Sequence, residues 1–175
     1  MTDLIAQARF DSPLGPLTAA ATARGIAGLW FDGQAQHPGP LNAPVDPGKR
    51  LLKQLRVALD AYWAGEPMPE LPLDLQGTAF QRTVWRSLLQ IGRGTTTTYG
   101  QIAQGCGSPL AVRAAGAAIG RNPACIVVPC HRVIGANGSL TGYGGGMAAK
   151  QWLLAHEQKH GQPRREHQLS LPSSW

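Results

Sequence analysis

A proline-rich segment, "EPMPELPLDLQG" at residues 66–77, divides the chain into halves with different hydrophobic patterns. Residues that precede a proline are disfavoured in helices, so this segment predicts an extended linker with a boundary near Gly77. Short alternating runs precede it, and helix-type repeats follow it. We therefore expect an α/β protein with one domain at residues 1–76 and a mainly helical domain at 77–158.

The first half predicts a small sheet covered by one helix. β-like runs at 5–10, 17–23 and 26–31 are separated by turn residues, and a Pro/Gly-rich loop fills 33–47. A helical pattern at 49–65 then ends at Gly65. Its apolar positions fall near one face: Leu52, Leu55, Leu59, Tyr62 and Trp63.

The second half opens with a predicted helix at 79–91, for which Thr78 is the N-cap. A short helix at 98–105 and the turn "GCGSP" come next. We expect Ser108 to cap a further helix with Pro109 in its first turn, ending by Gly120. Two short helices joined by a glycine-containing turn indicate a helix-turn-helix.

The predicted second helix of this motif has an unusual surface. Arg113 is the one charged residue between Leu110 and Ile119, and most of its neighbours are alanine or glycine. A small-residue face suits close approach to a flat partner, with Arg113 projecting. It equally suits tight packing on another helix, and the pattern leaves both open.

The remaining segments predict a strand, a wing and a last helix. The β-branched run at 126–128 fits a buried strand, and Asn137-Gly138 indicates a tight hairpin that resembles a wing. A glycine-rich loop around Tyr143 follows. A helix at 147–160 is closed by Gly161, and we expect residues 159–175 to contribute a polar, disordered tail.

Charge is unevenly distributed along the chain. Residues 1–74 hold six Lys/Arg and eight Asp/Glu, a net charge of −2, whereas residues 75–175 hold ten and two, a net charge of +8. This asymmetry favours a nucleic-acid partner for the second half. A solvated basic surface is the alternative.

Other classes of protein are disfavoured by the sequence. No apolar run approaches the roughly 20 residues of a membrane span. The beginning, "MTDLIAQARF", lacks the pattern of a signal peptide. Three cysteines without CxxC spacing make a disulfide framework improbable, so we expect a reducing, cytoplasmic location.

Cys130 lies in the most unusual segment, "IVVPCHRVIG" at 126–135. A free thiol has a pKa of about 8.5, so a nucleophilic role requires a base. His131 is adjacent, but consecutive side chains of an extended chain point apart, so contact requires a turn or a bridging water. Glu157, on the apolar side of its helix, is the candidate that orients the histidine. A buried structural cysteine is the alternative, and Cys106 and Cys125 are interpreted as packing residues.

The segment "HEQKH" at 156–160 matches the H-E-x-x-H pattern of zinc peptidases. His156 and His160 would bind zinc, and Glu157 would act as the base. A third ligand would have to come from elsewhere, such as Glu166. We expect instead that both histidines face solvent.

"PCHRV" at 129–133 resembles the active-site signature of the O6-alkylguanine-DNA alkyltransferases. The segments "TYGQIA", "GSPLAVRAAGAAIGRNP", "LTGYGGG" and "WLLAHE" follow that family's order and spacing. The resemblance implies an RNase H-like sheet-plus-helix domain followed by a winged helix-turn-helix domain. It also implies repair by direct reversal, in which a flipped O6-alkylguanine, or an O4-alkylthymine, gives its alkyl group irreversibly to Cys130 without a cofactor.

The resemblance assigns further roles residue by residue. Through a water, His131 takes the thiol proton, Glu157 holds His131, and Tyr99 assists protonation of the leaving guanine. Arg113 enters the base stack from a helix in the minor groove. The other expected DNA contacts are Ala114, Ser108 and Arg121; the hinge is Asn122; the pocket is Pro129, Val133, Tyr143, Gly144 and Gly145.

Two departures from the family pattern qualify this resemblance. Gly144 stands where some members have serine, so only a backbone N–H would meet the guanine oxygen there. Animal members carry zinc in the N-terminal domain, whereas this N-terminal half has no cysteine, so we expect no metal. The expected partner is double-stranded DNA, bound by a monomer, with cooperative binding left open. A lesion-recognition protein that does not repair is the alternative, which Cys130 disfavours.

Overall fold

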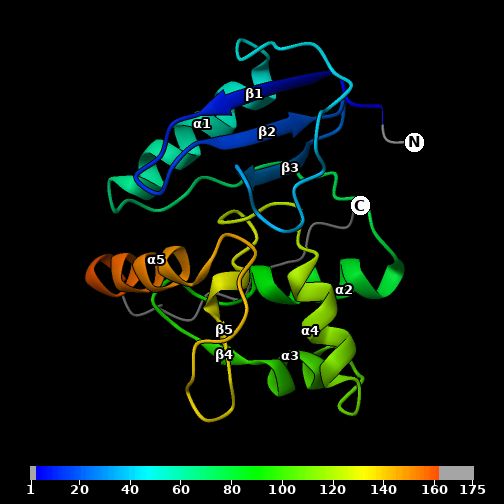
Figure 1. Cartoon of the computed structure of the whole chain (residues 1–175), viewed down its shortest axis with the longest axis vertical. Helices are drawn as coiled ribbons and strands as arrows, with labels where there is room; N and C mark the ends of the chain where they lie inside the picture. The colour runs from blue at the N-terminus through cyan, green and yellow to red at the C-terminus, as the bar shows by residue number, and fades with distance from the viewer. Residues whose placement is uncertain (1–2, 162–175) are drawn as a thin grey trace.

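The computed structural model describes residues 3–161. Its N-terminal domain is an antiparallel sheet in the order β1 (Ala6–Phe10), β2 (Leu17–Ala21), β3 (Ile26–Phe31), and the three strands fall in the predicted β-like runs. Helix α1 (Arg50–Trp63) lies across one face of this sheet (Figure 1). The fold is the predicted arrangement of a sheet-plus-helix domain followed by a mainly helical domain, while the exact boundary near Gly77 stays a prediction.

The apolar face of α1 forms the first hydrophobic core with the strands. Leu52, Leu55, Leu59 and Tyr62 are almost fully buried there, whereas Trp63 is only half-buried at the edge. The 3.6-residue repeat therefore identified the packed face correctly. Gly65 follows the helix with φ of 84°, a conformation that costs a glycine little.

The outer edge of β3 is paired with two segments from other parts of the chain. The Ile26 N–H donates to Pro72 O at 2.8 Å, and the Leu29 N–H donates to Pro123 O at 2.8 Å. The Cys125 N–H returns a hydrogen bond to Leu29 O at 2.9 Å. Because an open strand edge leaves donors and acceptors unpaired, these contacts fix the segment before Cys130 against the N-terminal sheet.

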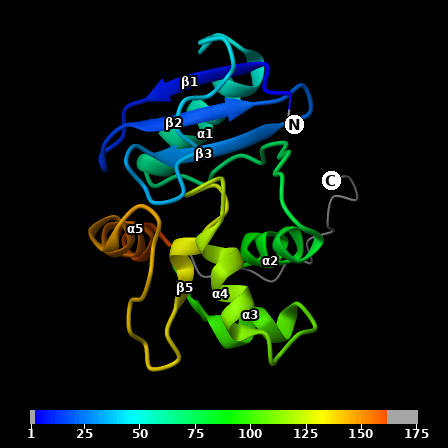
Figure 2. The ribbon, with the colours of Figure 1, turned by 45° about the vertical axis from the view of Figure 1, so that its right-hand side comes forward.

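Three helices build the core of the C-terminal domain (Figure 2): α2 (Ala79–Leu89), α3 (Tyr99–Gly105) and α4 (Val112–Gly120). Thr78 caps α2 and Thr98 caps α3, each in a capping box with the glutamine three residues later. The indole of Trp85 is buried and donates to Ala118 O at 2.9 Å. The helix-turn-helix formed by α3 and α4 is as predicted.

The predicted start of α4 was wrong. Ser108 and Pro109 lie in a turn closed by the Ala111 N–H on Ser108 O at 2.8 Å, and the helix begins at Val112. Its N-cap is Ala111, whose side chain has no oxygen to accept a hydrogen bond. Ser108 therefore does not cap the helix, because residues 108–111 form this turn and the helix begins only after it.

The predicted hairpin is also only partly correct. The Gly135 N–H donates to Ser139 O at 2.8 Å, so the tight turn at Asn137-Gly138 is formed. However, β5 (Val133–Ile134) pairs in parallel with β4 (Thr97–Thr98), and no second hairpin strand follows in the described chain. The residues from 140 to 146 form a loop in place of a two-stranded wing (Figure 1).

Helix α5 (Met147–His160) ends at Gly161, as predicted, and packs behind the short 3-10 turn that contains Cys130. The expected disordered tail lies outside the described residues from 162 onward. Within residues 3–161, none of the helices has the length and apolar character needed to cross a membrane.

Candidate active site

Cys130 begins a 3-10 turn (Cys130–Arg132) directly after an irregular segment. The prediction of a strand at 126–128 was wrong: Ile126 has φ of +72°, and the Val128 N–H donates to Ala124 O at 2.9 Å. A turn of this kind pairs the backbone N–H and C=O groups with neighbouring residues, so these β-branched side chains can enter the core without the segment pairing with a strand. Cys130 is buried, with 6% of its surface exposed.

Asn122 holds the thiol from the segment that joins α4 to the turn. Its Nδ2 donates to Val128 O at 2.8 Å and to the Cys130 Sγ at 3.0 Å, and its Oδ1 accepts the Ala124 N–H at 3.0 Å. The side chain is 97% buried by these contacts. The structure therefore places the predicted hinge residue in direct contact with the candidate nucleophile.

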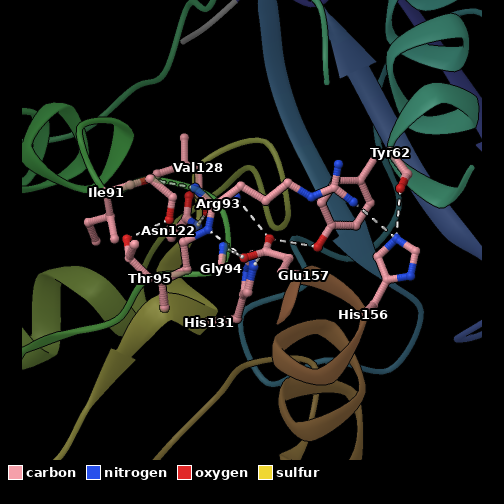
Figure 3. Close-up of polar contacts among 12 residues, drawn as sticks. Tyr62, Ile91, Arg93, Gly94, Thr95, Asn122, Val128, His131, His156 and Glu157 are labelled. Carbon is pink, nitrogen blue, oxygen red and sulfur yellow. Dashed lines mark hydrogen bonds and ion pairs between the residues drawn. The ribbon is translucent and has the colours of Figure 1, made fainter. Parts of the chain in front are cut away.

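His131 and Glu157 form the buried pair that the sequence predicted (Figure 3). The His131 Nε2 lies 2.8 Å from Glu157 Oε1, and neither side chain is exposed. Arg132 adds two hydrogen bonds of 2.8 Å to the same carboxylate and a third, of 2.5 Å, to Ile91 O. Arg132 thus neutralises the charge of Glu157.

The charges of this pair follow from burial and hydrogen bonding. Burial alone would raise the pKa of Glu157, but the hydrogen bonds from His131 and Arg132 hold it well below the usual range. Burial lowers the pKa of His131 despite the nearby carboxylate. The imidazole is therefore neutral near pH 7 with its proton on Nε2, which leaves Nδ1 as the basic atom. No atom of residues 3–161 hydrogen-bonds to Nδ1.

The surroundings of Cys130 favour its thiolate. The neighbouring Cys125 thiol, the Asn122 amide and the positive charge of Lys150 together outweigh burial and lower the pKa of Cys130. Cys125 itself is buried, and its thiol donates to Gln34 Oε1 at 3.3 Å. The interpretation of Cys125 as a packing residue therefore missed a polar contact with the N-terminal domain.

Lys150 is the residue that sequence reasoning missed. Its side chain is fully buried, and Nζ donates to Val133 O at 2.6 Å and to Thr141 O at 2.8 Å. Lys150, Leu153 and Glu157 follow the i, i+3, i+7 spacing of one helix face. The argument that singled out Glu157 as a charge facing the core applied equally to Lys150 and would have found it.

The predicted pocket residues lie on the loop before α5 and beside the 3-10 turn. The ring of Tyr143 lies 6.3 Å from that of His131, edge to face, and 6.4 Å from that of Phe31. A Cβ on Gly145 would lie 2.6 Å from Phe31 Cδ2, so glycine is required there, whereas Gly144 has more room. Pro129 and Val133 flank the 3-10 turn and are buried.

Three of the four candidate DNA-contacting residues are exposed on the helix-turn-helix, whereas Ser108 is half-buried in the turn between the helices. Arg113, Ala114 and Arg121 are exposed on or next to α4, while Ala115 and Ala118 pack inward. The small-residue helix therefore has one packed face and one free face. Tyr99 at the start of α3 donates to Thr141 O at 3.2 Å, which ties α3 to the pocket loop.

The geometry of residues 156–160 disfavours the zinc-peptidase interpretation, whose suggested third ligand, Glu166, lies outside the described residues. Glu157 already binds His131 and Arg132, and no group of three metal-ligating residues occurs in the part of the chain described here. The expectation that His156 faces solvent was wrong: it is half-buried, stacks on Trp152 at 4.8 Å and hydrogen-bonds to Tyr62 O at 2.8 Å.

A helix-turn-helix beside a 3-10 turn that holds a cysteine of lowered pKa is typical of DNA-binding proteins with a reactive cysteine. Residues 79–159 match the 6-O-methylguanine DNA methyltransferase, DNA binding domain, and residues 5–75 match its ribonuclease-like domain. The chain therefore belongs to the 6-O-methylguanine DNA methyltransferase family.

Individual proteins are similar to this chain over most of its length. A methylated-DNA–protein-cysteine methyltransferase from Mycolicibacterium paratuberculosis is 48% identical over 151 residues, covering 86% of this chain and 90% of that protein. The protein of the same description from Methanosarcina acetivorans is 43% identical over 150 residues, covering 85% and 95%. The crystal structure of Mycobacterium tuberculosis OGT in complex with DNA has a TM-score of 0.82 and 44% identity, covering 89% and 94%.

Proposed function

We propose that this protein repairs O6-alkylguanine in double-stranded DNA by moving the alkyl group to Cys130, once per polypeptide. The observation that carries the proposal is the setting of the thiol, which lies 3.0 Å from the Asn122 amide next to the His131–Glu157 pair. A lesion-recognition protein needs no such nucleophile. O4-alkylthymine is the second expected substrate.

The chemistry requires one displacement and one proton transfer. A water relays the thiol proton to Nδ1 of His131, while Glu157 keeps the other ring proton on Nε2. The Cys130 sulfur attacks the alkyl carbon, the bond from carbon to the guanine oxygen breaks, and Tyr99 assists protonation of the leaving base. The product is a thioether, which thiols do not exchange, so the chain reacts once.

DNA recognition is assigned to the exposed face of α4. Small residues let this helix approach the minor groove closely, and Arg113 fills the position of the base after it flips. We propose a monomer in solution and in the cytoplasm, the latter on the basis of the cysteine pattern.

The test is to mix the protein with duplex DNA that contains one O6-methylguanine and to analyse the digested protein by mass spectrometry. We expect one methyl group on the peptide that contains Cys130, with transfer ending at one equivalent per chain. Tight binding without transfer would support the lesion-recognition alternative, and continued turnover would contradict the irreversible step.

Replacing Arg113 with alanine is expected to slow repair of duplex DNA about ten- to hundredfold, because flipping a base costs a few kcal/mol that the arginine helps to offset. The reaction with free O6-benzylguanine should keep its wild-type rate, since no base has to leave a stack. The control is Arg56→Ala on the exposed side of α1, which should change neither rate. Equal slowing of both reactions by Arg113→Ala would refute the assigned role.

A further inference from the structure

The Glu157 carboxylate receives a hydrogen bond from the N-terminal domain. The hydroxyl of Tyr62, near the end of α1, donates to Glu157 Oε1 at 2.8 Å, and both groups are buried (Figure 3). The same oxygen accepts hydrogen bonds from His131 Nε2 and Arg132 Nη2, each at 2.8 Å. A residue 95 positions away in sequence thus shares the atom that orients the candidate base.

Tyr62 is itself fixed at several points. Its carbonyl oxygen is 2.8 Å from the His156 ring nitrogen, and the Arg93 guanidinium lies 5.3 Å from its ring centroid. Arg93 also donates to Gly65 O at 2.9 Å and so joins the loop after α2 to the end of α1. The phenol therefore has little freedom to move away from Glu157.

The remaining donors show what the phenol adds. The Glu157 Oε2 accepts hydrogen bonds from Arg132 Nε at 2.8 Å and from the Gly94 N–H at 3.3 Å. These two contacts hold one side of the carboxylate. On the other side, Oε1 is shared by His131, Arg132 and Tyr62, and Tyr62 is the donor that comes from the N-terminal domain. A carboxylate with donors on both oxygens cannot rotate, so the plane of the His131 ring is also fixed.

We propose that Tyr62 is a positioning residue for alkyl transfer: it acts through Glu157 to hold His131 in the orientation and tautomer that serve Cys130. The N-terminal domain thereby contributes to the chemistry and not only to stability. This inference rests on the proposed function, but it also makes predictions for the reactivity of Cys130 in the absence of DNA.

The phenol also affects the basicity of His131. A carboxylate that loses a donor carries more negative charge toward the imidazole, which favours the imidazolium form. Because the base must be neutral to accept the thiol proton, a raised pKa of His131 moves the acid limb of the rate profile to higher pH. The charged and titratable groups that face the pair are Arg132, Lys150, Arg93, Tyr62, Tyr143 and Cys130.

The test uses the full chain with Tyr62→Phe, which keeps the ring and removes the hydroxyl. We expect the rate of alkyl transfer from an O6-methylguanine duplex to fall about tenfold, the scale of one lost hydrogen bond to a charged group. The alkylation of Cys130 by iodoacetamide should slow as well, and the acid limb of its pH profile should move upward. The control is Trp63→Phe, a half-buried neighbour on α1, which should shift neither profile.

A double-mutant cycle separates positioning from packing. If Tyr62 acts through Glu157, adding Tyr62→Phe to a protein that already carries Glu157→Gln should change the rate of alkylation by iodoacetamide less than twofold, which is about 0.4 kcal/mol. The proposal would be overturned if the rate reductions of the two single variants multiplied in the double variant. A pH profile of Tyr62→Phe that is not shifted from that of the wild type would overturn it as well. If Tyr62→Phe proves unstable, 3,5-difluorotyrosine at position 62 is used instead, because it keeps the ring and makes the hydroxyl a stronger donor. The acid limb of the pH profile for Cys130 alkylation should then move to lower pH, and an acid limb that does not move downward would overturn the proposal.

The two proposals can fail separately. If the wild-type protein does not accept methyl groups from DNA, the proposed function fails, while the iodoacetamide profiles still report whether Tyr62 controls Cys130. If transfer occurs and Tyr62→Phe matches the wild type in both assays, only the role of Tyr62 is lost.

Discussion

Replacing Cys130 with serine is expected to reduce alkyl transfer by more than about a thousandfold, because a serine hydroxyl is far less acidic and less nucleophilic than a thiol. The amide of Asn122, 3.0 Å from the sulfur, can donate equally to a serine oxygen, so the fold and the DNA-binding face should be unchanged. The measurement is single-turnover transfer from an O6-methylguanine duplex, together with binding of the same duplex. We expect binding to persist in a protein that cannot repair.

The control for this substitution is Cys106→Ser. Cys106 is half-buried at the end of α3, and burial raises its pKa, so it lacks the lowered pKa of Cys130. This variant should transfer alkyl groups at the wild-type rate. If Cys130→Ser still repaired DNA and the added substitution Cys106→Ser abolished that activity, the nucleophile would be Cys106 and the assignment to Cys130 would be wrong.

The sequence predicted the parts of the site that depend on local patterns. Glu157 was found because His131 needed a group to orient it and a carboxylate on the apolar face of a helix must have a partner. Most of the helices, the cap at Thr78 and the sheet followed from periodicity and turn residues, which act within a few positions, whereas the predicted cap at Ser108 was wrong. These are the features for which neighbouring residues carry enough information.

The features that the sequence did not predict depend on contacts between distant segments. Residues 126–128 have strand-type composition, but the hydrogen bonds of the preceding residues to β3 and the positive φ of Ile126 give them a turn. Tyr62 had been assigned to the core by its helical spacing, which cannot show that its hydroxyl meets Glu157. Tertiary packing decides such cases, and a single sequence does not record it.

Glu157→Gln is expected to have the second-largest effect, on both stability and repair. Removing one partner of a buried ion pair leaves Arg132, only 12% exposed, without its counter-charge, which typically costs 3–5 kcal/mol of unfolding free energy, and we expect roughly that loss at pH 7. Alkyl transfer should fall by roughly a hundredfold, because the glutamine amide can present N–H to His131 and no longer fixes its tautomer. Urea unfolding and single-turnover transfer measure the two effects.

The pH dependence identifies the carboxylate as the cause. The pKa of Glu157 is lower in the folded protein than in the unfolded chain, where it is about 4.3. Its contribution to stability is therefore complete above that pH and is lost as the pH falls through the folded-state value. The difference in unfolding free energy between the wild type and Glu157→Gln should accordingly be largest near pH 8, where His131 is neutral, and shrink below about 4 as Glu157 is protonated. The control Glu70→Gln, at an exposed position in the linker, should show no such difference, and a Glu157→Gln deficit that is independent of pH would mean that packing, and not charge, stabilises this site.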